Sequence, residues 1–181
     1  MSEKLVDVVN QNNVLVGQAV PLVEAHTKGY WHRTVHVYVY RRRGDTVEFL
    51  THLRSKEKRF NPNLWDTRFG SHIPAGGDIK STIESGVRKE FGVQVATHAL
   101  IVGELRKRDN FPNREFTHIC FFELDDDVNS LKLNAREVQE VRWRTIDEIR
   151  ESMQITPEIW SSGLNRFNEV SEYLLQKIAL P

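Results

Sequence analysis

Three residues that could contribute to a chemical site, Gly86, Lys89 and Glu90, share one arc of a predicted helix. The stretch from Ser71 to Val93 has the pattern of a Gly-rich loop followed by a short helix. At about 100° per residue, the three positions fall beside the apolar stripe of that helix. Such an arc beside a Gly-rich loop suits a metal and phosphate site, although Gly86 and Lys89 leave it with a single carboxylate.

The helix itself is predicted by its apolar spacing and its end signals. Ser81 followed by Glu84 forms a capping-box pattern at the start, and Gly92 is placed to end the helix. The apolar stripe recurs every four residues, at Ile79, Ile83, Val87 and Phe91.

Length and composition indicate a single globular domain covering residues 1–181, with 39% apolar and 28% charged residues. The net charge of zero gives no electrostatic case for nucleic acid or for a membrane surface. The N-terminus lacks the apolar core of a signal peptide, and no apolar run is long enough to span a bilayer. The single cysteine, Cys120, excludes an internal disulfide and is interpreted as a core residue. A cytoplasmic enzyme or binding protein is the expected class.

The elements that must position the arc form a mixed sheet with helices on its faces, an α+β fold. Residues 31–40 alternate, with Val35, Val37 and Val39 on one face and His36, Tyr38 and Tyr40 on the other. The remaining expected elements are a hairpin over 4–19, strands over 46–54, 115–124 and 138–143, a strand pair or bent strand over 93–106, a polar loop over 107–114, and helices over 145–153 and about 157–178, the first with a Thr145/Glu148 capping box.

Several landmarks in order resemble the Nudix superfamily, and more narrowly its branch that includes isopentenyl-diphosphate isomerase and hydrolase relatives. They are DVVNQNNVLVGQA, His32-Arg33, Arg54 with Lys58, NPNLWD, and EVRW followed by TIDEI. The resemblance covers nearly the whole chain. It implies the Nudix fold, a mixed sheet sandwiched between helices, and often a homodimer.

The family's signature box is G-x5-E-x7-R-E-U-x-E-E-x-G-U, where U is aliphatic, and it aligns without gaps over 71–93. Of its five charged positions, only Glu90 keeps the family residue. The other box positions that differ hold Ser71, Gly77, Ser85, Gly86 and Lys89. The family's glutamates hold Mg²⁺, a cation that needs several oxygen ligands. The resemblance therefore implies a degenerate box with a weak metal site.

Glu90 is the candidate catalytic residue, and Glu90, Asp78 and Glu115 are the candidate ligands of Mg²⁺ or Mn²⁺ if the protein is active. A partly solvated helix glutamate is the alternative for Glu90, and helix capping is the favoured alternative for Asp78. Glu104 is a further candidate outer carboxylate. The candidate phosphate-binding residues are Arg54, Lys58, Arg59 and Lys89, with a solvated charged surface as the alternative.

The isomerases of this branch carry a C-G-H pattern before the box and a metal site of histidines and glutamates. This chain has Gly70-Ser71-His72, so the catalytic cysteine is absent. His32, His72 and Glu115 fall at or near matching positions, whereas His26 is one residue out of the required spacing and Asn113 replaces a glutamate. A remnant transition-metal site and ordinary strand or loop histidines both remain open, with the second favoured.

The preferred functional hypothesis is a Nudix-fold protein that binds a nucleotide or other small-molecule diphosphate, with weak or no pyrophosphohydrolase activity and no bound metal required. One alternative is an active metal-dependent hydrolase of a nucleoside diphosphate derivative. Another is a non-catalytic interaction scaffold, and a diphosphate isomerase ranks last. No nucleic-acid or membrane partner is expected.

Overall fold

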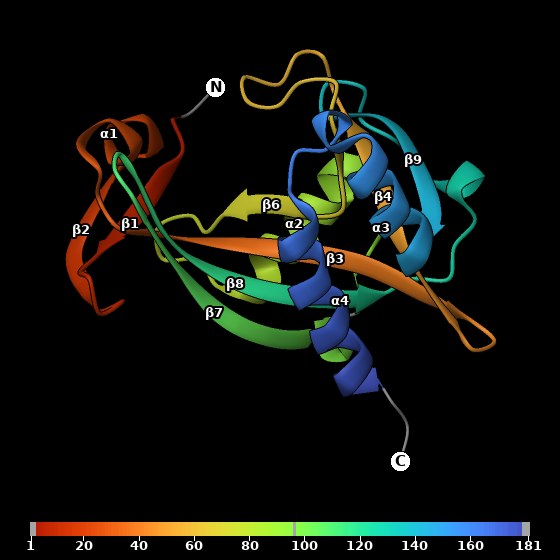
Figure 1. The fold of residues 1–181 in the computed structure, drawn as a ribbon. Helices are drawn as coiled ribbons and strands as arrows, with labels where there is room; N and C mark the ends of the chain where they lie inside the picture. The colour runs from red at the N-terminus through yellow and green to blue at the C-terminus, as the bar shows by residue number, and fades with distance from the viewer. Residues whose placement is uncertain (1–2, 96, 179–181) are drawn as a thin grey trace.

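The computed structural model describes residues 3–95 and 97–178, which form a central β-sheet between helices and a small N-terminal lobe (Figure 1). The strands are β1 (Leu5–Val9), β2 (Leu15–Pro21), β3 (His32–Arg43), β4 (Thr46–Arg54), β5 (Trp65–Asp66), β6 (Phe69–His72), β7 (Ile101–Asn110), β8 (Asn113–Glu123) and β9 (Val138–Thr145). The helices are α1 (Leu22–Lys28), α2 (Ile79–Phe91), α3 (Ile146–Ile155) and α4 (Leu164–Ile178). None of the helices in the described ranges is long and apolar enough to cross a membrane.

The central sheet is mixed and is organised around β3. Its order is β5-β4-β3-β8-β7, with β6 also paired to β3 and β9 to β4. The pair β3–β8 is parallel, with His32 opposite Glu115, whereas β6 runs antiparallel to β3 with His72 opposite Thr34. This register brings residues that are far apart in the chain to one end of the sheet.

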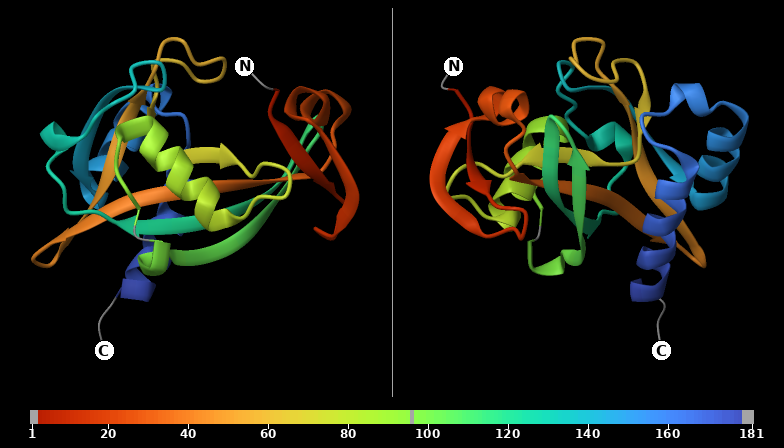
Figure 2. Two further views of the ribbon diagram at one scale, coloured as in Figure 1. Left: turned by 180° about the vertical axis from the view of Figure 1, so that it is seen from behind. Right: turned by 60° about the vertical axis from the view of Figure 1, so that its left-hand side comes forward.

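Helices cover both faces of the sheet, with α2 on one side and α3 and α4 on the other (Figure 2). As predicted, Val35, Val37 and Val39 pack with α2, while Tyr38 and Tyr40 pack on the side of α3 and α4. The predicted apolar stripe of α2 is likewise confirmed, because Ile83, Val87 and Phe91 are buried in the first cluster and Ile79 packs against it.

The N-terminal lobe consists of β1, β2 and α1 and has a small apolar cluster of its own, Val6, Val20 and Ala25. Gly29 ends α1 with φ 69°, a left-handed conformation that glycine adopts readily. A Cβ there would lie 2.6 Å from the ring of Phe111, so the tip of the β7–β8 hairpin packs directly on this turn. The lobe also meets the loop before α2, because Asp7 accepts a hydrogen bond from the Gly76 amide.

The start of α2 differs from the predicted capping box. The helix begins at Ile79 with Asp78 as its N-cap, and Asp78 accepts hydrogen bonds from the Ser81 amide at 3.0 Å and the Ser81 hydroxyl at 2.7 Å. Glu84 instead pairs with Arg88 on the next turn. The Ser81/Glu84 box is therefore wrong by three residues, while the Gly92 end and the Thr145/Glu148 box are confirmed.

Replacing Asp78 by alanine should reduce the free energy of unfolding by about 1 kcal/mol, because one amide at the start of α2 loses its acceptor. Chemical denaturation measures the change. Asp78→Asn keeps a side-chain acceptor and should lose only part of that stability. Equal losses in the two variants would show that the charge, and not the cap, matters at this position.

Three other expectations are corrected. Among the described residues of 93–95 and 97–100 there is a short 3-10 turn and no strand, and the expected loop over 107–114 is a tight hairpin between β7 and β8. The final helix begins at Leu164, after a separate 3-10 turn at Pro157–Ile159, because Ser161 is drawn back to the Trp65 carbonyl of β5.

Candidate functional site

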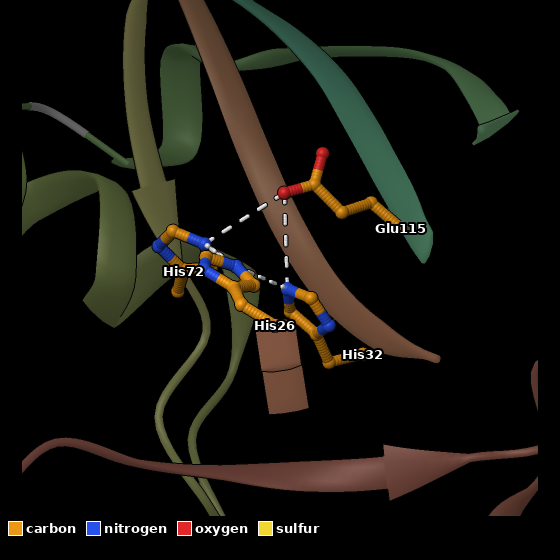
Figure 3. A group of neighbouring side chains, drawn as sticks. All are labelled: His26, His32, His72 and Glu115. Carbon is orange, nitrogen blue, oxygen red and sulfur yellow. Dashed lines mark hydrogen bonds and ion pairs between the residues drawn. The ribbon is translucent and has the colours of Figure 1, made fainter. Parts of the chain in front are cut away.

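Four potential metal ligands from four different elements converge at one end of the sheet (Figure 3). His26 lies on α1, His32 on β3, His72 on β6 and Glu115 on β8. The Nε2 atom of His26 is 3.2 Å from Nε2 of both His32 and His72. One Glu115 oxygen is 3.7 Å from Nε2 of His32 and of His72. The sheet register explains the convergence, since His32 faces Glu115 directly across the parallel pair.

A hydrogen bond between His32 and the main chain shows which of its ring nitrogens is free to bind a metal. Its Nδ1 lies 2.9 Å from the Tyr30 carbonyl oxygen, which can only accept. Nδ1 must therefore carry the proton, and the lone pair of Nε2 points at the other members of the cluster. This arrangement, a second partner fixing the tautomer, is the one usual for metal-binding histidines.

Two of the histidines, His72 and His26, are also held neutral. Burial lowers the pKa of His72 to about 3, with His32 and His26 acting in the same direction. The pKa of His26 is lowered as well, by burial first and then by His32. At neutral pH, the 3.7 Å approach of His72 to Glu115 is therefore not an ion pair. Neutral imidazole is the form that binds metals.

The donor set fits a divalent transition metal. A metal bound at about 2.05 Å in tetrahedral geometry needs donors about 3.3 Å apart. Four of the six donor separations, two of 3.2 Å and two of 3.7 Å, bracket that value, and all the donor atoms lie within 4.8 Å of one another. Three imidazoles and a carboxylate suit Zn²⁺ and other first-row metals better than Mg²⁺. Asn113 lies two residues before Glu115 on the same strand face, and its buried Oδ1 has no hydrogen-bond partner among the described residues.

A cleft of about 310 Å³ adjoins this cluster, and His72 lines it as well. Its charged lining residues are Lys4, Lys58, Lys89, Glu90 and Glu137. They come from the N-terminal lobe, the loop after β4, α2 and the segment before β9. The cleft therefore combines three ammonium groups with two carboxyl groups beside a histidine of the cluster.

Glu137 binds both Lys58 and Lys89, one with each carboxylate oxygen. Burial acts to raise the pKa of Glu137, but hydrogen bonds from Lys58 and Lys89 outweigh it and lower the pKa, so the group is ionised at neutral pH. Burial and the nearby Lys89 lower the pKa of Lys4. Lys4 makes no ion pair within the described part of the chain, which leaves one cation in the cleft uncompensated.

Glu90 lies partly buried in the cleft. Burial raises its pKa to about 7, and Glu137 adds to the rise while Lys58 and Lys89 oppose it. A carboxyl group with a pKa near neutrality can accept or release a proton under physiological conditions. Its assignment as the catalytic residue remains a prediction.

Ser71 and Gly86 form a matched pair on the wall of the cleft. Ser71 faces Val35 in the sheet register and therefore points toward α2, opposite to His72. A Cβ at Gly86 would lie 2.8 Å from the Ser71 side-chain oxygen. The helix thus approaches the strand closely here because position 86 carries no side chain. Any larger residue at position 86 would require the Ser71 side chain to rotate away.

The predicted site residues divide into two groups. Lys58, Lys89 and Glu90 line the cleft, whereas Glu115 belongs to the histidine cluster. In the described residues this cluster is the one group of three or more potential ligands found together, and it includes neither Glu90 nor Asp78. The histidines, favoured as ordinary strand and loop residues from the sequence, are thus brought into a metal-like constellation.

The remaining candidates lie outside the lining of the cleft. Arg54 donates to the carbonyls of Phe60 and Asn61, and Arg59 stacks on Phe60 at 5.3 Å. Glu104 is exposed on β7 near Arg106. The phosphate-binding role of the two arginines remains a prediction.

Sequence reasoning missed Lys4 and Glu137 and undervalued His26. Lys4 and Glu137 belong to no motif. His26 lies on α1 and His32 on β3, on either side of the turn at Gly29, so their spacing along the chain did not indicate that they would meet. The seven histidines of the chain were the one available signal.

Comparison with known proteins agrees with this architecture. No protein-family profile matches the chain. An uncharacterised Nudix hydrolase of Clostridium acetobutylicum is 28% identical over 98% of this chain and 88% of its own length. An isopentenyl-diphosphate Delta-isomerase of Pectobacterium atrosepticum is 28% identical over 83% of this chain and 82% of its own.

Solved structures show the same fold. The Deinococcus radiodurans protein DR0079 matches with a TM-score of 0.69 at 18% identity, covering 94% of this chain and 99% of that one. Nudix and MutT structures match with TM-scores of 0.52 to 0.58. The mixed sheet between helices is therefore the Nudix fold. The chain is similar to members of the Nudix hydrolase superfamily, and the proteins that it resembles include ones named as Nudix hydrolases and as isopentenyl-diphosphate isomerases.

Proposed function

We propose that this protein binds a small molecule carrying a diphosphate group, beside a divalent transition metal held by His26, His32, His72 and Glu115, and that it has little or no Nudix-type hydrolase activity. The observation that carries the proposal is the position of His72, which belongs to the histidine cluster and also lines the lysine-bearing cleft. A ligand in the cleft would therefore lie beside His72, one of the four candidate metal ligands.

The cleft's cations suit a phosphate ligand. Lys4, Lys58 and Lys89 approach it from three separate segments, and ammonium groups bind phosphate as point charges. The choice of a diphosphate follows the isomerase and hydrolase relatives. When bound, the metal would supply a Lewis acid at the end of the cleft, held by the four side chains named above.

Weak hydrolysis follows from the composition of the box. Mg²⁺ requires several oxygen ligands, and Glu90 is the single family carboxylate left on α2. Lys89 places an ammonium on the same helix turn, bound to Glu137. A carboxylate at position 86 would additionally have to displace the Ser71 hydroxyl.

Calorimetry with inorganic pyrophosphate in EDTA tests the binding claim. We expect binding by the wild-type protein and about tenfold weaker binding by Lys58→Met, because one desolvated ion pair to phosphate is lost. Lys80→Met, an exposed lysine at the start of α2, is the matched control and should bind as wild type. Absence of pyrophosphate binding by the wild type would contradict the proposal.

Release of phosphate or nucleoside monophosphate from a panel of diphosphates, with Mg²⁺ or Mn²⁺, tests the hydrolysis claim. We expect no turnover above background. Turnover that Glu90→Gln abolishes would instead establish an active hydrolase.

The histidine cluster favours one second candidate, proton transfer on an isoprenoid diphosphate, since isomerases are among the relatives. Gly70 occupies the position of the isomerases' cysteine and argues against it. Incubating isopentenyl diphosphate with Zn²⁺-loaded protein in D₂O decides the matter by NMR. Deuterium incorporation at carbon would support the isomerase candidate.

A further inference from the structure

Glu137 occupies the cleft in the way that a ligand's phosphate would. Its two carboxylate oxygens are taken up by two ammonium groups from different elements, Lys58 and Lys89. The carboxylate is only 16% exposed and Lys58 is 26% exposed, so this pair is partly shielded from solvent and is stronger than a typical surface pair, whereas Lys89 is 65% exposed. Any anion that enters between the two lysines must compete with it.

We propose that Glu137 is a specificity-determining residue that fills the anion subsite between Lys58 and Lys89 until a ligand's phosphate displaces it. The inference rests on the proposed function, because it assumes that the cleft binds a diphosphate. Displacement breaks two ion pairs, so the exchange favours a group with more charge than a single carboxylate. Phosphates meet that condition, and Lys4 provides an additional cation with which Glu137 does not pair.

The exchange requires a side-chain movement without opening of the loop. The Glu137 carbonyl accepts a hydrogen bond from the Ser55 amide at 3.0 Å, and its amide donates to the Asn134 carbonyl at 2.8 Å. Asn134 in turn donates from its amide to the Glu90 carbonyl at the end of α2. The backbone is thus tied to the neighbouring loop and to the box helix, whereas in the described part of the chain the carboxylate is held only by the two lysines.

Two roles for Glu137 predict effects of opposite sign. If it competes with the ligand, Glu137→Gln removes both the competing ion pairs and the repulsion of an incoming phosphate. If it arranges the lysines for the ligand, the same substitution loosens them and weakens binding. The sign of the change in affinity therefore distinguishes the two roles.

The test is calorimetry with inorganic pyrophosphate in EDTA, comparing wild type, Glu137→Gln and the control Glu140→Gln. Glu140 lies three residues further on, pairs with Arg142 and does not line the cleft. We expect Glu137→Gln to bind pyrophosphate at least about fivefold more tightly than wild type, with Glu140→Gln unchanged.

Unchanged or weaker binding by Glu137→Gln, with wild type binding normally, would overturn the role of Glu137 and leave the proposed function standing. Failure of both proteins to bind would overturn the two together. If Glu137→Gln does not fold, ¹³C NMR of labelled wild-type protein replaces it. Saturating pyrophosphate should move the Glu137 carboxyl resonance toward that of a solvated glutamate, and an unmoved resonance would overturn the inference.

Discussion

Replacing His72 by alanine is expected to weaken Zn²⁺ binding by at least about a hundredfold. His72 offers one of three imidazole donors, and the residues left behind, His26, His32 and Glu115, would be a three-coordinate set open to the cleft. The loss should be larger than that from a residue that merely orients a ligand, for which about ten- to a hundredfold is usual.

Calorimetry with Zn²⁺ and the visible spectrum of the Co²⁺ form measure this change. His98→Ala, which removes an exposed histidine from a 3-10 turn, is the matched control and should bind metal as wild type. Zn²⁺ should also raise the melting temperature of the wild type and not of His72→Ala, because a metal that binds only the native state stabilises it. Equal metal affinity in wild type and His72→Ala would refute the proposed centre.

Replacing Glu90 by glutamine is expected to increase the free energy of unfolding by about 1–3 kcal/mol at pH 8. Burial raises the pKa of Glu90 to about 7 in the folded protein, above the ordinary value of 4.5. Between these values the folded state binds more protons than the unfolded state. The wild type therefore loses stability as pH rises from about 4.5 to 7, and glutamine, which has a similar shape and no charge, avoids that loss.

Chemical denaturation of both proteins at pH 5 and pH 8 measures the difference. The gap should be small at pH 5, where Glu90 is protonated in the folded state, and should reach its full size at pH 8. Glu84→Gln, on the outer face of the same helix, should change stability by less than about 0.5 kcal/mol at either pH. A gap that is independent of pH would mean that Glu90 is ionised in the folded protein throughout this range.

A carboxylate that destabilises the fold is typical of a functional position. The cleft holds Glu90 beside Glu137 in a partly buried setting, where a neutral residue would be more stable. This destabilising charge is consistent with a role for Glu90 in ligand binding or proton transfer. Comparing the pH dependence of pyrophosphate affinity in the wild type and Glu90→Gln would reveal such a role.

Local patterns in the sequence were sufficient to predict the strands and helices in which apolar residues recur at a regular spacing. The alternation of β3 and the four-residue stripe of α2 each follow from the geometry of the element, so they could be interpreted without knowledge of the neighbours. The start of α2 could not, because Asp78 and Ser81 are both good caps and only the path of the preceding loop selects between them.

The sequence by itself determined the Nudix fold, the lone box glutamate at position 90 and the absence of the isomerases' cysteine. The tertiary structure decided the rest of the site. His26, His32, His72 and Glu115 span 90 positions of the chain, and only the parallel register of β3 with β8 and the seating of α1 against the sheet bring them within 4.8 Å of one another. Lys4 and Glu137 likewise join the cleft through loop packing, which no local spacing encodes because it depends on contacts between segments far apart in the chain.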